Sequence, residues 1–165
     1  YLHKGTFARG KGLFSPVEFK PAVELPDDEY PYLLTTGRIL YHFHTGSMSR
    51  RAKGLDIIRP EGFAELNPET AESLGLTHGD YVRVASRRGE VTTRAWVTER
   101  VPPQVVFMPF HFEEAPANVL TNPALDPKAK IPELKVAAVQ LEFAGEGEAA
   151  ELEGGISGAQ EEEGV

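Results

Sequence analysis

The chain of 165 residues contains no cysteine. Disulfide bonds, iron–sulfur ligation, thiolate zinc sites and a cysteine nucleophile are therefore excluded for these residues. The sequence also has no run of 18 apolar residues, which excludes a membrane-spanning helix of ordinary length. We expect no direct membrane insertion of this chain.

Basic residues are the scarcer charged class. Lys and Arg total 17 against 25 Asp and Glu, so the formal net charge is −8. The acidic excess lies at the end, because residues 144–165 hold seven Glu, six Gly and no basic residue. A net-acidic chain without a basic stripe excludes nucleic acid as an expected partner. Residues 144–165 lack the apolar side chains that would offset their ordering entropy, and we expect this acidic tail to be disordered.

The first 29 residues read as a lead-in to a folded domain. Proline recurs every five residues from Pro16 to Pro31, which favours extended chain over helix. Apolar residues alternate from Leu13 to Phe19, and this segment is predicted to form one strand. Because the chain starts at Tyr1 and not at Met, we expect residues 1–29 to lead in from a preceding domain.

Residues 30–143 carry the pattern of a small β-barrel. Asn67, Pro68 and Gly75 have the spacing of an N-cap, a first helical residue and a C-terminal stop, which predicts one helix of two turns. Strands separated by short turns are typical of a mainly β barrel. The predicted strands are 32–36, 63–66, 81–86, 90–98, 105–110 and 136–143.

Two long polar segments interrupt the strands, at residues 38–54 and 111–135. Loops of this length without a clear period are usually either functional or wrongly assigned. They gather cations that could hold phosphates and amides that could read the edge of a heterocycle. The cations are Arg38, Arg50, Arg51, Lys53, Lys130 and Lys135, and the small or polar residues are Gly37, Thr45, Gly46, Ser47 and Asn118.

Three other site types are disfavoured by the sequence. The glycines of residues 5–12 approach a P-loop, but Gly12 stands where a hydroxyl would hold magnesium. His42 and His44 could begin a metal site, yet His111 is the sole obvious third ligand. Ser47 lies near these histidines without a nucleophile-elbow motif, so a hydrolase triad is unsupported.

Four ordered motifs resemble a known family. They are EYPYLLTTGR with LYHFHTGSMSR (29–50), GFAELNPETA (62–71), MPFHF with ANVLTN (108–122) and PELK (132–135). Together they resemble the C-terminal cofactor-binding domain of molybdopterin oxidoreductases, with the formate dehydrogenase catalytic (alpha) subunit as the nearest member. The similarity covers residues 13–143, and it departs from the family at Leu134, where an aromatic residue is common.

The resemblance implies a double-psi β-barrel with two long ligand-binding loops, and a bis-molybdopterin guanine dinucleotide cofactor. In the intact enzyme, dithiolene sulfurs hold molybdenum or tungsten, and formate is oxidised to carbon dioxide. The resemblance places Thr36, Gly37 and Arg38 beside the dinucleotide. It places His42, His44, Thr45 and Ser47 on the pterin or its phosphates, with His111, Asn118 and Lys135 completing the pocket. It assigns no catalytic residue and no metal ligand to this chain.

Without a metal ligand, the chain is expected to be a C-terminal part of a larger enzyme, inactive alone and without cofactor when isolated. The expected partners are the remaining domains of the same catalytic subunit and electron-transfer subunits. The expected location is the cytoplasm, with the periplasm left open. Two alternatives remain: a stand-alone dinucleotide-binding subunit, as in formylmethanofuran dehydrogenases, and a double-psi barrel that acts only in protein–protein contact.

Overall fold

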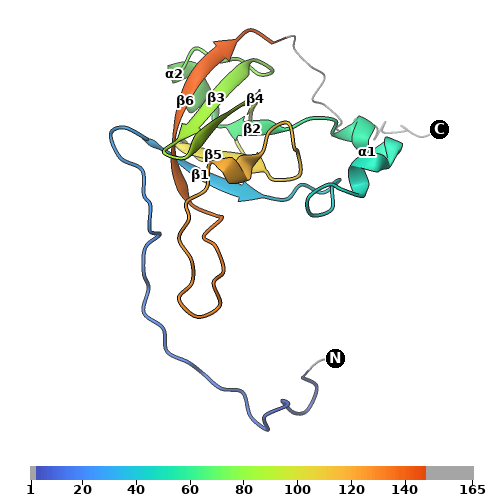
Figure 1. The fold of residues 1–165 in the computed structure, drawn as a ribbon, viewed down its shortest axis with the longest axis vertical. Helices are drawn as coiled ribbons and strands as arrows, with labels where there is room; N and C mark the ends of the chain where they lie inside the picture. Colours follow the sequence, from blue (N-terminus) through green and yellow to red (C-terminus); the bar gives the residue numbers. More distant parts are fainter. Residues whose placement is uncertain (1–2, 148–165) are drawn as a thin grey trace, which may run out of the picture.

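The computed structural model describes residues 3–147, in which six strands close into one barrel (Figure 1). A few short helices lie outside the barrel wall, so the prediction of a mainly β fold is confirmed. The strands are β1 (Tyr32–Gly37), β2 (Phe63–Leu66), β3 (Tyr81–Ser86), β4 (Gly89–Val97), β5 (Val105–Pro109) and β6 (Ala137–Gly145). The helices are α1 (Lys53–Ile58) and α2 (Pro68–Ser73), with 3₁₀ turns η1 (Ser49–Arg51) and η2 (Ala117–Val119).

The barrel contains two parallel strand pairs among antiparallel ones. The strand order is β1-β5-β2-β4-β3-β6, and β6 closes the ring by pairing with β1. β1 runs parallel to β5 and β2 runs parallel to β4, whereas the other neighbours are antiparallel. This is the double-psi arrangement that the sequence resemblance implies. Closure leaves no free strand edge on the barrel.

The core follows the alternation of the strands. Val82 and Val84 of β3 point inward and are fully buried, whereas Arg83 and Ala85, which alternate with them, are partly exposed. The second long loop also enters the core, because Phe112, Ala117 and Leu120 are buried in the same hydrophobic cluster. This loop is therefore held by apolar packing at several points before it reaches Lys135.

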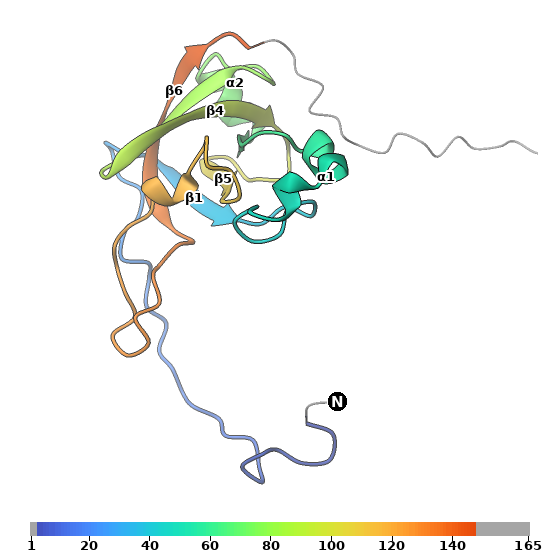
Figure 2. The same ribbon diagram turned by 45° about the vertical axis from the view of Figure 1, so that its right-hand side comes forward.

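Two predictions about secondary structure are wrong. Residues 13–19 form no strand, because no other described segment pairs with them, and the chain runs away from the barrel there (Figures 1 and 2). The first long loop, predicted at residues 38–54, contains η1 and ends in the first turn of α1. The sequence hid α1 because Ala52 provides no side-chain cap and Gly54 lies inside the helix.

The end of the barrel also differs from the prediction. β6 continues to Gly145, which pairs with Tyr81 beyond a bulge, so the strand includes the first two residues assigned to the acidic tail. The N–H of Gly147 then donates to Oδ1 of Asp80 over 3.2 Å. The rest of the predicted disordered tail, from residue 148, lies outside the described residues. Within residues 3–147, no helix is long and apolar enough to cross a membrane.

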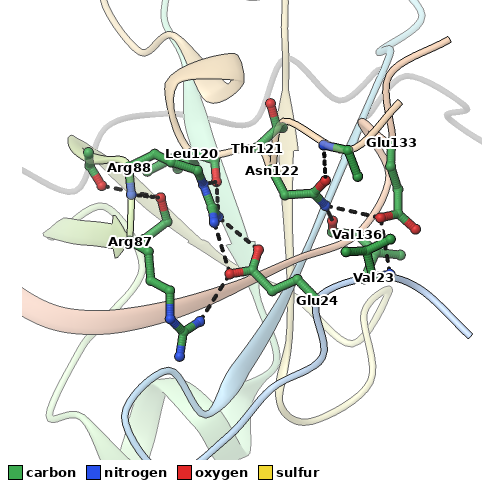
Figure 3. Close-up of polar contacts among 12 residues, drawn as sticks. Val23, Glu24, Arg87, Arg88, Leu120, Thr121, Asn122, Glu133 and Val136 are labelled. Carbon is green, nitrogen blue, oxygen red and sulfur yellow. Dashed lines mark hydrogen bonds and ion pairs between the residues drawn. The ribbon is translucent and has the colours of Figure 1, made fainter. Parts of the chain in front are cut away.

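A partly buried carboxylate, that of Glu24, joins the lead-in to the barrel (Figure 3). Glu24 accepts hydrogen bonds from Arg87 over 3.0 Å and from both terminal nitrogens of Arg88 over 2.9 and 2.8 Å. Arg88 also donates to the carbonyl of Leu120 over 2.7 Å. The β3–β4 turn therefore binds the lead-in and the second loop at the same point.

A second set of contacts lies beside the first (Figure 3). The N–H of Val23 donates to Oε2 of Glu133 over 3.2 Å. The side-chain amide of Asn122 donates to the same Glu133 oxygen and to the carbonyl of Val136, over 3.1 and 2.9 Å. The lead-in and both ends of residues 122–136 are thus tied together.

The cap of α2 gives a first prediction. The Asn67 side chain accepts from the N–H of Glu69 over 3.0 Å, and its amide donates to the carbonyl of Val101. Asn67→Ala is expected to lower the free energy of unfolding by about 1 kcal/mol, because a helix N–H loses its partner. Urea unfolding of the chain measures the change. Asn67→Asp keeps the cap acceptor and should recover part of the loss, and equal losses in both variants would contradict the capping role.

Candidate functional site

The two long loops meet beyond the end of β1, as the sequence predicts. Between them lies a cavity of about 630 Å³. Six of the residues predicted from the sequence line it, together with two that the sequence analysis did not assign to the site. The first group is Thr36, Arg38, His44, Thr45, Asn118 and Lys135, and the second is Phe110 and Leu134.

The end of β1 is bonded to the last part of the second loop. Nζ of Lys135 donates to the carbonyl of Thr36 over 2.6 Å, and the Thr36 hydroxyl donates to the carbonyl of Leu134 over 2.6 Å. These two bonds span almost one hundred positions of sequence. They fix the lysine at one wall of the cavity.

Two cations lie near one aromatic ring in this cavity. Cζ of Arg38 is 6.0 Å and Nζ of Lys135 is 5.9 Å from the centre of the Phe110 ring. The cavity lining contains no carboxylate. Its positive charge is therefore not neutralised from within, which favours an anionic ligand that also has an aromatic ring.

His111 lies behind the cavity and joins the two loops. Its ring is buried, Nε2 accepts the N–H of Ile39 over 3.0 Å, and Nδ1 donates to the carbonyl of His44. This pair of bonds requires the neutral ring with its proton on Nδ1. Burial is the largest cause that lowers the pKa of His111, the carbonyl of His44 opposes it, and nearby His42 and Arg38 lower it further.

His42 is turned away from the cavity. It is buried, with Nδ1 facing the hydroxyl of Ser49 over 3.1 Å and Nε2 facing the carbonyl of Arg59 over 2.7 Å. The two ring nitrogens thus bind the start of the first loop to its later part at Ser49 and to the residue that follows α1. The structure does not bring this histidine to the cavity with its predicted neighbours, although its contact with a pterin stays a prediction.

Gly37 and Gly46 allow close approaches that a side chain would block. A Cβ on Gly37 would lie 2.5 Å from the ring of Phe107 in β5. Gly46 has a φ of +77°, and a Cβ there would lie 2.7 Å from the carbonyl oxygen of His111. Both glycines therefore set the path of the first loop.

Ser47 lies in a neighbouring cavity of about 400 Å³. Thr45 lines both this cavity and the first one. Arg50 also lines it, and its guanidinium is paired with Glu114 over 2.7 Å and lies near Asp56 at 3.5 Å. The second cavity is thus more nearly neutral than the first.

A third cavity, of about 600 Å³, was missed by sequence reasoning. It is lined by Arg59, Trp96 and Arg100 as well as by Arg38, and Glu65 is also part of its lining. Burial raises the pKa of Glu65, against the opposing charges of Arg100 and Arg59. These residues come from separate elements and form no motif along the chain. The one available signal was the single tryptophan of the sequence.

Within residues 3–147, no group of three or more His, Asp or Glu side chains has an arrangement that could hold a metal ion. The donor set of the main cavity consists of cations, an amide, hydroxyls and aromatic faces. These groups suit phosphates and heterocycles.

A family model and curated relatives match this chain. The model of the family described as "Molydopterin dinucleotide binding domain" matches residues 32–138. The F420-dependent formate dehydrogenase subunit alpha of Methanocaldococcus jannaschii is 55% identical over 143 residues, which are 86% of this chain and 21% of that protein. The F420-dependent formate dehydrogenase 2 subunit alpha of Methanococcus maripaludis is 51% identical over 143 residues, again 86% and 21%. The chain spans about a fifth of the length of these relatives.

Among solved structures, acetylene hydratase from Pelobacter acetylenicus has the same fold over 70% of this chain and 19% of its own. The TM-score is 0.61 at 20% sequence identity. This likeness concerns the fold alone.

The buried His111 gives a second prediction. Its pKa is lowered in the folded chain, so the unfolded chain binds more protons between the folded value and about 6.5. The free energy of unfolding should therefore fall as the pH drops below about 6.5. Above that pH, the contribution of the neutral His111 ring to stability is complete. Denaturant titrations between pH 5 and pH 8 measure this dependence.

Two variants identify the group responsible. His111→Gln is expected to show a weaker pH dependence, because an amide can accept and donate without titrating. His3→Gln, on the exposed lead-in, serves as the control and should keep the dependence of the original chain. An unaltered pH profile in His111→Gln would show that another group controls it.

Proposed function

The chain belongs to the family of molybdopterin dinucleotide-binding domains, and from this membership we propose that it is the cofactor-binding domain of a formate dehydrogenase-like oxidoreductase. The cofactor we propose is bis-molybdopterin guanine dinucleotide carrying molybdenum or tungsten. The identity of 55% and 51% with formate dehydrogenase alpha subunits supports formate as the substrate. Because those relatives are about five times longer, the complete activity would require the rest of such a subunit.

The single observation that carries the proposal is the cavity between the loops. It combines two cations, no carboxylate and an aromatic ring within a space of about 630 Å³. A dinucleotide brings phosphates and flat heterocycles, and therefore needs both charge and ring faces. Within residues 3–147, the donor set fits this group.

Each lining residue has a separate task in this proposal. Arg38 and Lys135 neutralise phosphate oxygens, and the ring of Phe110 offers a face for stacking. The amide of Asn118 can read the edge of a heterocycle, and Thr45 can donate a hydroxyl. When bound, the metal and its dithiolene ligands supply the two-electron redox chemistry.

His111 acts through other residues. It fixes the backbone of Ile39 and His44, so both ends of the first loop's turn keep their positions relative to the second loop. A neutral ring adds no charge to the site. It is a positioning residue.

Both alternatives from the sequence are less well supported. The relatives do not support a stand-alone subunit, because they are alpha subunits of formate dehydrogenases and are about five times longer than this chain. A barrel used only for protein contact would have no need of a cavity that holds cations without a carboxylate. It would also not need to bond residues as distant in sequence as Thr36 and Lys135 across that cavity's wall.

The third prediction tests the cations in the full-length enzyme. Arg38→Ala and Lys135→Ala should each weaken cofactor binding roughly ten- to a hundredfold, because a charge-assisted contact contributes about 1.5–3 kcal/mol. Molybdopterin and metal content of the purified enzyme measure the loss. Lys128→Ala, an exposed residue on the same loop that does not line the cavity, is the matched control.

A further variant separates charge from local structure. Lys135→Gln can keep a donor to the carbonyl of Thr36 while removing the positive charge. If charge is the cause, its cofactor content should be as low as that of Lys135→Ala. Normal cofactor content in Arg38→Ala and in both Lys135 variants would refute the assignment of this cavity.

A fourth prediction concerns the chain alone. It should fold, because its barrel is closed and its core is continuous, but it should not reduce a dye with formate. The purified chain and the full-length subunit are compared in the same dye assay. Formate-dependent dye reduction by the chain alone would contradict the assignment of the chemistry to the rest of the subunit.

A further inference from the structure

The arm, defined as residues 11–23, leaves the barrel (Figures 1 and 2). Several of its large apolar side chains are exposed. Phe14, Val17 and Phe19 are 96%, 89% and 91% exposed. Isolated apolar residues on a surface are ordinary, but a run of them on one extended segment indicates a contact surface. The arm therefore has the apolar side chains of a buried segment, but nothing within residues 3–147 packs over them.

The arm has the side-chain pattern of a strand. Leu13, Val17 and Phe19 occupy odd positions, so in extended chain they share one side. Glu18 and Lys20 lie on the other side, together with Phe14. This is the alternation that predicted a strand at residues 13–19. The structure shows the pattern without the pairing.

The backbone of the arm is also unpaired. Among residues 3–147, no backbone-to-backbone hydrogen bond involves residues 11–22, and the first bond of the arm is from Val23 to the side chain of Glu133. A strand with free N–H and C=O groups and one apolar side is suited to adding itself to the edge of another sheet.

We propose that residues 11–23 dock as an added β-strand on the remainder of the longer subunit. This inference rests on the proposed function, because it takes the chain to be part of such a subunit. The occupant is an apolar surface bordered by a free strand edge. The relatives provide room for it, since this chain spans about a fifth of their length.

A second copy of the described barrel does not meet this requirement. Its six strands form a closed ring, so the barrel has no free edge to which another arm could be added. The partner surface must therefore lie outside residues 3–147 of this chain, or consist of another arm.

Docking of the arm would restrain the proposed cofactor cavity. Glu24 and Val23, where the arm joins the barrel, are bonded to Arg88 and to Glu133 (Figure 3). Glu133 directly precedes Leu134 and Lys135, which line the cavity. The same contacts that hold the base of the arm thus hold one wall of the site.

Amide hydrogen exchange in the full-length subunit tests this inference. Amides of residues 13–20 should exchange at least about tenfold more slowly than those of an unstructured peptide. The double variant Val17→Asp/Phe19→Asp should lose this protection and speed exchange in residues 123–135. The control Glu18→Gln/Lys20→Gln, on the other side, should leave both unchanged.

Three results would overturn the docking. They are exchange of the arm at the rate of an unstructured peptide, protection that survives in Val17→Asp/Phe19→Asp, and protection that disappears on dilution, which would indicate paired arms of two copies. If the double variant fails to fold, exchange in the unmodified subunit decides the matter. Molybdopterin content of the same sample is measured separately. A protected arm in a subunit that binds no molybdopterin refutes the proposed function and keeps the docking, whereas bound molybdopterin with an unprotected arm does the reverse.

Discussion

The parallel pairing of β1 with β5 is the constraint on which the site depends. Because the two strands run in the same direction, with Gly37 opposite Pro109, the loops that follow them leave the barrel at the same rim. The imidazole of His111 then joins these loops through the backbone of Ile39 and His44. Strand direction brings the loops together, and one neutral side chain sets their separation.

The charge of the site results from selective pairing elsewhere. Arg50, Arg83, Arg87 and Arg88 each meet a carboxylate, so most guanidinium charge near the barrel is neutralised. Within residues 3–147, Arg38 and Lys135 form no ion pair, and both line the cavity between the loops. Arg38 also lines the third cavity. A near-neutral body can thus present a local positive field to a ligand.

The sequence was a good guide wherever the signal was local. Alternation in residues 81–97 predicted the β3–β4 hairpin, and Asn67 with Pro68 predicted the start of α2, because these patterns act within a few residues. The meeting of the two loops was expected from the family resemblance, which placed residues of both loops in one pocket. The sequence did not predict that His42 points away from the cavity. Its partners, Ser49 and the carbonyl of Arg59, are brought to it by the tertiary path of the chain.

Closure of the barrel determines the order in which the fold can be completed. β1 and β6 are the first and last strands, and Leu33 pairs with Ala138, about one hundred positions away in sequence. Such distant pairing forms slowly, since loop entropy must be lost before the contacts are gained. Until β6 arrives, β1 and β3 both present open strand edges to other molecules. During synthesis, the chain is therefore most exposed to aggregation just before its last strand is added.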